Sequence, residues 1–164
     1  MEDLTIDFDD WRLNCRAGVI ITHNNKILVH HNLNETYYAL IGGRVKLGED
    51  SENTVKREIK EELGKDIELT GYIATIENFF NLRGKKYHEI MFIHKAEFLN
   101  EKDRDIQYTL KNIEGEEDIN YEWIDLKDID KAQIKPDIIK NVLKQGIFPQ
   151  HIINNDFLNS VRND

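Results

Sequence analysis

Hydrophobic side chains recur with a helical period in one segment of the chain. Val55, Ile59 and Leu63 follow one another at intervals of four residues, which places three branched aliphatic side chains on one stripe of a helix. Gly64 comes directly afterwards, and glycine is common where a helix ends because it tolerates left-handed backbone angles. The pattern predicts an amphipathic helix that packs this stripe against a core and ends at Gly64.

Most other hydrophobic residues lie in short runs rich in Val, Ile and aromatic residues, which are typical of β-strands. We expect strands over residues 14–22, 26–31, 37–41, 67–80, 87–98, 106–110 and 121–124. The link 23–25 has the composition of a tight hairpin turn, and Gly71 suits a bulge. A second helix is expected from Pro136 to about Gln145, with Gly146 as its stop.

This order of elements predicts an α/β or α+β fold in which helices cover both faces of a mixed sheet. The chain has 164 residues, which is enough for one domain with its own core and too few for two comfortable ones. We therefore expect a single domain over residues 1–164. Its acidic start, residues 1–11, and its last residues, 157–164, are expected to be poorly ordered.

Composition narrows the classes of function. The net charge of −9 argues against a protein that binds the nucleic-acid backbone, since such a protein needs a basic patch. Cys15 is the only cysteine, so no internal disulfide can form and a reducing compartment is expected. The sequence shows neither a basic, apolar leader nor an apolar run of membrane length. We therefore expect a cytoplasmic protein with no membrane partner.

The predicted helix also carries an acidic face. Glu58, Glu61 and Glu62 stand at positions i, i+3 and i+4, so their carboxylates lie together. Like charges four residues apart repel by roughly 0.2–0.5 kcal/mol, and the last turns of a helix favour cations instead. Either this face is simply solvated, or a positive group offsets its charge. Carboxylate oxygens are the ligands that suit Mg²⁺ or Mn²⁺.

Residues upstream of the helix complete a motif with fixed spacing. Its positions, all within residues 43–65, are Gly43, Glu49, Arg57, Glu58, Ile59, Glu61, Glu62 and Gly64. This spacing resembles the signature of the Nudix hydrolases, and eight matching positions make the resemblance specific. Lys65 stands where the signature usually ends in an aliphatic residue, and Ile41 where Pro commonly precedes the two glycines. Because the flanking elements resemble the same family, the expected architecture is the Nudix fold, an α/β/α sandwich with a central mixed sheet.

The resemblance implies roles for the acidic face. Glu58 and Glu62 would be the main metal ligands and catalytic residues, and Glu61 would act as a further ligand or as the catalytic base. Gly43 would contribute backbone contacts near the metal. The expected cofactor is Mg²⁺, with Mn²⁺ as the alternative.

The resemblance also implies a structural ion pair between Glu49 and Arg57, which would hold the loop on the helix. It further implies an enzyme that hydrolyses a diphosphate bond in a nucleoside diphosphate linked to another group. ADP-ribose-like compounds and (d)NTPs are the leading substrates, followed by nucleotide sugars. Homodimers are common among similar proteins.

A non-catalytic Nudix-fold sensor of a nucleotide ligand is the alternative function. The intact Glu58, Glu61 and Glu62 favour the enzyme, because a protein that only binds its ligand does not need three mutually repelling carboxylates.

Several aromatic and polar residues after the motif suit a substrate pocket. Phe79, Tyr87 and Glu89, with Phe80 and His88 beside them, lie in two predicted strands, where aromatic rings can stack on a base and Glu89 can add a polar contact. Burial of Phe79 and Phe80 in the core is the competing interpretation.

Three further features have ordinary and functional interpretations. The acidic stretch 114–118 is either a solvated loop or the source of a late carboxylate, with Tyr121 and Trp123 just beyond it. His30 and His31 are neighbours on a strand and point to opposite faces, so they do not readily share one ion. Cys15 has no evident catalytic partner and is expected to be a buried structural thiol.

Overall fold

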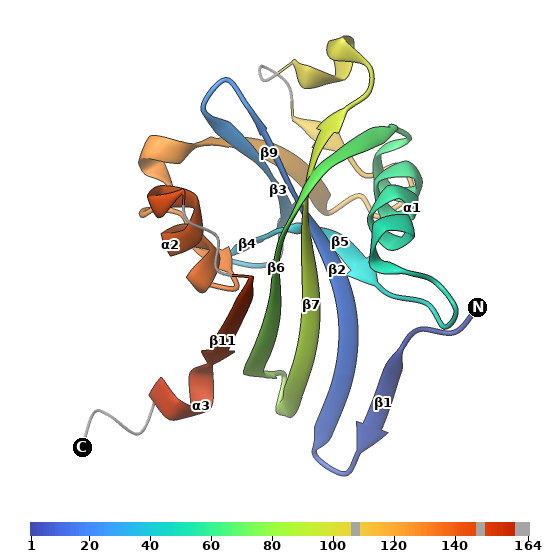
Figure 1. Ribbon diagram of the computed structural model, residues 1–164, viewed down its shortest axis with the longest axis vertical. Helices are drawn as coiled ribbons and strands as arrows, with labels where there is room; N and C mark the ends of the chain where they lie inside the picture. The colour runs from blue at the N-terminus through green and yellow to red at the C-terminus, as the bar shows by residue number, and fades with distance from the viewer. Residues whose placement is uncertain (106–108, 147–149, 160–164) are drawn as a thin grey trace.

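The computed structural model describes residues 1–105, 109–146 and 150–159 (Figure 1). The longer strands are β2 (Trp11–His23), β3 (Lys26–Asn32), β6 (Ile67–Leu82), β7 (Lys85–Phe98) and β9 (Ile119–Asp125). The shorter strands are β1 (Thr5–Phe8), β4 (Tyr38–Ala39), β5 (Ile41–Arg44), β8 (Leu110–Lys111), β10 (Ile134–Lys135) and β11 (His151–Asn155). The helices are α1 (Ser51–Leu63), α2 (Ile138–Gln145) and α3 (Asp156–Asn159), with 3₁₀ turns at Glu101–Arg104 and Leu126–Asp128. None of the helices in these ranges is both long enough and apolar enough to cross a membrane.

The strands form a mixed sheet. Along its main path the order is β10-β4-β3-β2-β7-β6-β11, while β1 and β5 pair with β2, and β9 pairs with β3. β2 runs parallel to β7 from Trp11 opposite Lys86 to Ile21 opposite Ala96. β6 and β7 form a long antiparallel hairpin, and β11 adds a parallel strand beside β6.

The two faces of the sheet contribute to two separate cores. Along β2, the side chains of Ala17, Val19 and Ile21 join the core that contains the buried stripe of α1. Ile20, between them, joins the other core, to which α2 contributes Ile139 and Val142. This alternation follows from the two-residue period of a strand. Because α1 and α2 lie on opposite sides of the central strands (Figure 1), the architecture is the expected α/β/α sandwich with a mixed sheet.

Helix α1 has the predicted buried stripe and the predicted end. Val55, Ile59 and Leu63 are buried, and Gly64 adopts left-handed angles, with φ of 67° and ψ of 15°. At the other end, the Asp50 side chain accepts a hydrogen bond from the backbone N–H of Asn53 and caps the helix. Helix α2 likewise ends at Gly146, as predicted.

One strand prediction needs correction. The single strand expected over residues 37–41 is two short strands, because β4 pairs with β3 and β10 whereas β5 pairs with β2. The strand expected over residues 106–110 falls largely outside the described residues, and β8 begins at Leu110. The bulge predicted at Gly71 is present as register shifts in the β6–β7 hairpin on either side of this residue.

The described parts of both chain ends contain regular structure, and the poor order expected of these ends stays a prediction. β1 pairs with the start of β2, so Thr5–Phe8 and Trp11 belong to the sheet. Near the other end, the Phe157 ring, at the start of α3, packs edge-on against Trp11, with 5.6 Å between ring centroids. The hydrophobic pattern did not predict β1, because an acidic residue stands between its hydrophobic residues and only Thr5 is even half-buried.

Candidate active site

Two glycines of β5 bring the backbone against the acidic face of α1. A Cβ on Gly43 would overlap the carboxylate of Glu58, and a Cβ on Gly42 would overlap the carbonyl oxygen of Ala17. Gly42 also has a φ of 151°, which side chains disfavour. The close approach of strand and helix at Gly43 therefore depends on the absence of a side chain.

Hydrogen bonds from Arg57 hold the loop before α1 against the helix. Its Nε and Nη2 donate to the two carboxylate oxygens of Glu49 at 2.8 and 2.9 Å, and Nη2 also donates to the carbonyl oxygen of Arg44 at 3.1 Å. Thr54 donates a further hydrogen bond to Glu49. These contacts, first of all the one with Arg57, lower the pKa of Glu49 to about 2. The structure thus brings Glu49 and Arg57 together as a two-pronged ion pair.

The same guanidinium also holds two carboxylates of the acidic face. Arg57 Nη1 donates to Glu58 Oε1 at 2.6 Å and to Glu61 Oε2 at 2.9 Å. The Glu58 side chain is nearly buried, whereas that of Glu61 is 39% exposed. A single positive charge therefore lies between two of the predicted metal ligands.

Glu62 differs from these two glutamates. Its Oε2 is buried and has no hydrogen-bond partner among the residues that the structure describes. Burial, followed by repulsion from Glu58 and Glu114, raises the pKa of Glu62 to about 7, while the Tyr121 hydroxyl partly offsets this shift. A buried carboxylate with an unpaired oxygen is costly unless a donor or a cation satisfies it.

The acidic stretch after β8 brings one further carboxylate to this face. The backbone N–H of Ile113 donates to the carbonyl oxygen of Glu62 at 2.9 Å, which holds the start of the stretch against the end of α1. Burial and the charges of Glu61 and Glu58 raise the pKa of Glu114. The side chain of Glu114 itself remains exposed, so its role as a late carboxylate stays a prediction.

The acidic face fits a divalent cation by its chemistry. Across the described ranges of the chain, no three acidic, His or Cys side chains converge on one point as they stand. However, Glu58, Glu61, Glu62 and Glu114 supply hard oxygen ligands of the type that Mg²⁺ and Mn²⁺ take. The unpaired oxygen of Glu62 requires a positive or donating partner, and Gly43 leaves the space beside Glu58 free of a side chain.

A cavity of about 300 Å³ is lined by Arg16 and by one of the three predicted substrate-binding residues, Glu89, and its lining residues Leu40 and Met91 belong to the core on the α2 side of the sheet. Phe79 and Tyr87 are not among its lining residues. The Phe79 ring packs against His88 at 4.3 Å, and the Tyr87 ring stacks at 4.9 Å on Phe80, which does line the cavity. Tyr87 therefore contacts the cavity only through the ring of Phe80.

Arg16 connects the cavity with the acidic face, and the sequence analysis did not identify it. Its Nη2 donates to the carbonyl oxygen of Gly42 at 3.2 Å, and its Nε lies 4.0 Å from Glu89 Oε2. Its charge also acts on Glu62, whose pKa it tends to lower. The one available signal in the sequence was a cation within an otherwise Val- and Ile-rich strand.

The histidines and the cysteine have ordinary surroundings. His31 Nδ1 lies 2.8 Å from Glu122 Oε1, while His30 packs edge-on against the ring of Tyr121 at 5.6 Å, so the two histidines face different neighbours. Cys15 is half-buried and packs against the core of α1.

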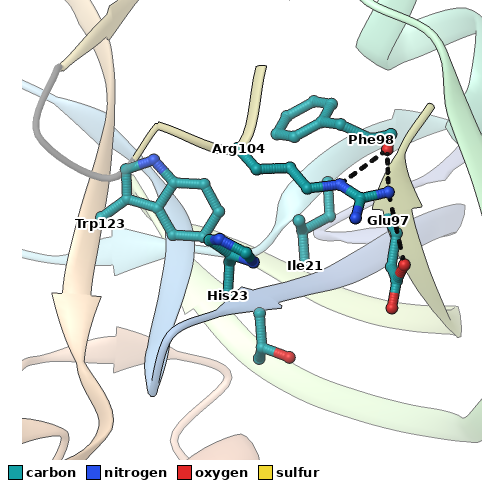
Figure 2. Close-up of a pocket in the computed structure, with 7 residues that line it drawn as sticks. Ile21, His23, Glu97, Phe98, Arg104 and Trp123 are labelled. Carbon is teal, nitrogen blue, oxygen red and sulfur yellow. Dashed lines mark hydrogen bonds and ion pairs between the residues drawn. The ribbon is translucent and has the colours of Figure 1, made fainter. Parts of the chain in front are cut away.

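A second, much smaller cavity of about 40 Å³ lies at the far end of β2, where Trp123 of β9 forms one wall (Figure 2). Arg104 points into it, but its Nε and Nη2 donate to the carbonyl oxygen of Phe98 at 3.1 and 2.7 Å. Nη2 also lies 3.6 Å from Glu97. The guanidinium is thus bound by its own neighbours, and this cavity contains none of the carboxylates of α1.

Comparison with known proteins agrees with this geometry. The sequence model of the NUDIX domain matches residues 13–144. No curated protein matches the chain significantly.

Solved structures show the same fold at low sequence identity. A NUDIX-family hydrolase from Clostridium perfringens is 20% identical, with 80% of this chain and 92% of that chain covered and a TM-score of 0.57. An ADP-ribose pyrophosphatase from Streptococcus suis is 15% identical, with 85% and 98% covered and a TM-score of 0.58. A MutT NUDIX hydrolase from Burkholderia pseudomallei is 22% identical, with 82% and 98% covered and a TM-score of 0.58.

Proposed function

The chain belongs to the NUDIX family, whose enzymes cleave diphosphate bonds, and we propose that it is a Mg²⁺-dependent pyrophosphohydrolase, with Mn²⁺ as an alternative cofactor. Its substrate is a nucleoside diphosphate linked to another group, either an ADP-ribose-like compound or a (d)NTP. A water molecule attacks one phosphorus of the diphosphate, and the products are a nucleoside phosphate and a phosphorylated remainder.

The main support for this proposal is the environment of the Glu62 carboxylate. It is a largely buried carboxylate with one unpaired oxygen and a pKa raised to about 7, and it lies beside other carboxylates. Such a group destabilises the metal-free fold, so its presence is best explained by a cation that binds there. The same cation also reconciles an anionic diphosphate with a protein of net charge −9.

Glu58, Glu61 and Glu62 are the proposed ligands, with Gly43 allowing the backbone to approach them. When bound, a divalent cation neutralises charge on the phosphoryl oxygens and lowers the pKa of the attacking water. Arg57 holds Glu58 and Glu61 side by side, and its ion pair with Glu49 keeps the loop in place.

Two carboxylates are candidates for the base that takes the proton of the water. Glu61 is the most exposed of the three helix carboxylates, and Glu114 reaches the same face from a separate loop. The raised pKa of Glu114 moves it towards the range in which a carboxylate accepts a proton effectively near neutral pH.

The proposal also includes a cytoplasmic location. Cys15 is the only cysteine of the chain, and it is free. A protein that functions without disulfides suits a reducing compartment.

Hydrolysis by wild type and by Glu62→Gln tests the proposal. The panel comprises ADP-ribose, NADH, dinucleoside polyphosphates, nucleotide sugars and (d)NTPs, each with Mg²⁺ and with a chelator in its place. Loss of a group that merely supports a metal ligand costs about 10- to 100-fold in activity, so loss of Glu62 itself should cost at least about 100-fold. Glu68→Gln, which neutralises an exposed glutamate of β6, is the matched control and should retain full activity.

The outcomes separate the enzyme from the sensor. Metal-dependent cleavage of one compound that is lost only in Glu62→Gln supports the enzyme and identifies the substrate. If no compound is cleaved while one of them still raises the melting temperature, the chain is a nucleotide sensor. Full activity of Glu62→Gln in Mg²⁺ would show that Glu62 is not a ligand.

A further inference from the structure

A row of polar side chains crosses the sheet beneath the cavity. Its members stand directly opposite one another in the register of five adjacent strands: Thr5 of β1, Asn14 of β2, Glu89 of β7, Asn78 of β6 and Asn154 of β11. The three central members are buried, with exposed fractions of 2% for Asn14 and 6% for both Glu89 and Asn78. A continuous polar row in the interior of a sheet is costly unless every group has a partner.

The hydrogen bonds of the row converge on Glu89 from both sides. From one side, Thr5 Oγ1 donates to Asn14 Oδ1 at 2.9 Å, and Asn14 Nδ2 donates to Glu89 Oε2 at 3.0 Å. From the other side, Asn154 Nδ2 donates to Asn78 Oδ1 at 2.7 Å, and Asn78 Nδ2 donates to Glu89 Oε1 at 3.4 Å. The side-chain amides of Asn14 and Asn78 thus both donate to Glu89, as suits a carboxylate acceptor.

The partners of Glu89 leave part of its acceptor capacity unused. A carboxylate has about four lone-pair sites, whereas Glu89 accepts from the described residues one bond of ordinary length and one of 3.4 Å, which is long for an N–H···O bond. Arg16 Nε is 4.0 Å away, and this arginine also donates to the carbonyl oxygen of Gly42. A buried, charged group with unused acceptor sites therefore faces the cavity.

The lining of the cavity suits a planar ring. Its volume of about 300 Å³ lies at the lower end of the range for small-ligand sites. Phe80, whose ring stacks with that of Tyr87, adds an aromatic side chain to the lining, and Leu40, Met91 and Pro136 add apolar surface. Aromatic and apolar walls above a polar floor bind a nucleobase well, because the ring stacks while its edge forms hydrogen bonds.

We propose that this cavity is the nucleobase site and that Glu89 selects a base with two adjacent N–H donors, as guanine has at N1 and N2. The inference rests on the proposed function, which places the diphosphate at the acidic face of α1, on the other side of Arg16. A carboxylate pairs with two neighbouring donors in a planar, two-bond geometry. Adenine offers only one donor on this edge, beside an acceptor nitrogen that the carboxylate repels.

Binding of GMP, IMP and AMP by titration calorimetry tests the inference. None of these compounds contains a diphosphate and the buffer contains no divalent cation, so the result is independent of hydrolysis. IMP differs from GMP only in lacking the N2 amino group. A two-bond base contact discriminates by about 1–3 kcal/mol, so GMP should bind roughly 10- to 100-fold more tightly than IMP or AMP.

Two variants test whether the Glu89 carboxylate causes the preference for GMP. Glu89→Gln should abolish most of the preference for GMP, because the amide presents a donor in place of an acceptor. Glu68→Gln is the matched control, since it neutralises an exposed carboxylate of β6 that does not line the cavity and should preserve the preference. A purely structural role of Glu89 would weaken the binding of all three nucleotides in the same proportion.

Three results would overturn the inference. They are equal affinities of the wild type for GMP, IMP and AMP, a preference for GMP that survives Glu89→Gln, and tight binding of ribose 5-phosphate that is lost in Glu89→Gln. The last result would show that Glu89 binds sugar hydroxyls. The wild-type comparison of GMP with IMP needs no variant and therefore decides the matter even if Glu89→Gln does not fold. If the chain hydrolyses no compound of the panel but still binds GMP more tightly than IMP and AMP, only the proposed function is contradicted.

Discussion

At the scale of single residues, the acidic face depends on a glycine as much as on its acids. Gly43 lies so close to Glu58 that an added methyl group would occupy the position of its carboxylate. Glu58 is in turn held by Arg57, which also binds Glu61 and Glu49. A change at Gly43 therefore acts on the whole set of ligands through direct contact.

Gly43→Ala should reduce both stability and activity. The methyl group must displace Glu58 or separate β5 from α1, and overpacking of this kind typically costs about 1–3 kcal/mol. Urea denaturation and Mg²⁺-dependent hydrolysis measure the two effects. Gly71→Ala is the control, because a Cβ at that position meets no atom within 4 Å. Equal stability and activity of Gly43→Ala and the wild type would show that the backbone does not need this close approach.

His30 should make stability depend on pH in the acid range. Burial, together with the positive charges of Arg16 and His31, lowers the pKa of His30 from 6.5 to about 4, so the folded state favours the neutral ring. The unfolded chain takes up the proton first. This contribution to stability is therefore complete above about pH 6.5 and is lost as the pH falls towards 4.

His30→Gln removes this titration while keeping a polar side chain. The difference in the free energy of unfolding between wild type and His30→Gln should be constant from pH 7 to 8. It should then shift by roughly 1–3 kcal/mol, against the wild type, between pH 6.5 and 4. Urea denaturation at intervals of one pH unit measures this. A difference that stays constant down to pH 4 would show that His30 takes up its proton in the folded state.

At the scale of secondary structure, α1 places the acids in its last turns, so its end matters for the site. Gly64 closes the helix in a left-handed conformation directly after Leu63, and its N–H donates to the carbonyl oxygen of Lys60. This end also lies against the loop of Glu114, since a Cβ on Gly64 would be 3.0 Å from Ile113 Cδ1.

Gly64→Ala should destabilise the protein by about 1 kcal/mol, because alanine disfavours the left-handed angles. Gly64→Asn should restore part of the loss, since asparagine tolerates these angles. Chemical denaturation of the three proteins measures the difference. If Asn is as destabilising as Ala, crowding against Ile113 outweighs the backbone angle.

Prediction of the elements succeeded where the signal was local. The stripe Val55, Ile59 and Leu63 and the stop at Gly64 need only neighbouring residues to be recognised, and both are present. β1 escaped prediction because its stability comes from pairing with β2 and from no hydrophobic pattern of its own. The break between β4 and β5 likewise reflects pairing with different partner strands.

At the scale of the whole molecule, the sheet brings the two halves of the site together. β2 carries Arg16 between the acidic face, which α1 provides, and the cavity, in which Glu89 of β7 lies. The α1 side holds the carboxylates that we propose bind a cation, and the cavity provides apolar walls with the buried carboxylate of Glu89. This division suits a substrate whose diphosphate and base need opposite chemistry.

The sequence by itself determined the acidic helix, because its pattern depends on spacings of a few residues, while the specific fold and the ion pair of Glu49 with Arg57 were implied by the resemblance to the Nudix signature. Only the tertiary structure decided that the loop before Glu114 lies against the end of α1, that Arg16 donates to β5 while lining the cavity, and that Tyr87 stacks on the cavity-lining ring of Phe80. The polar row shows the physical reason. Its hydrogen bonds join residues as many as 76 positions apart, and they depend on which strands pair and in which register. Strand pairing is settled by the packing of the complete sheet, and no local pattern encodes it.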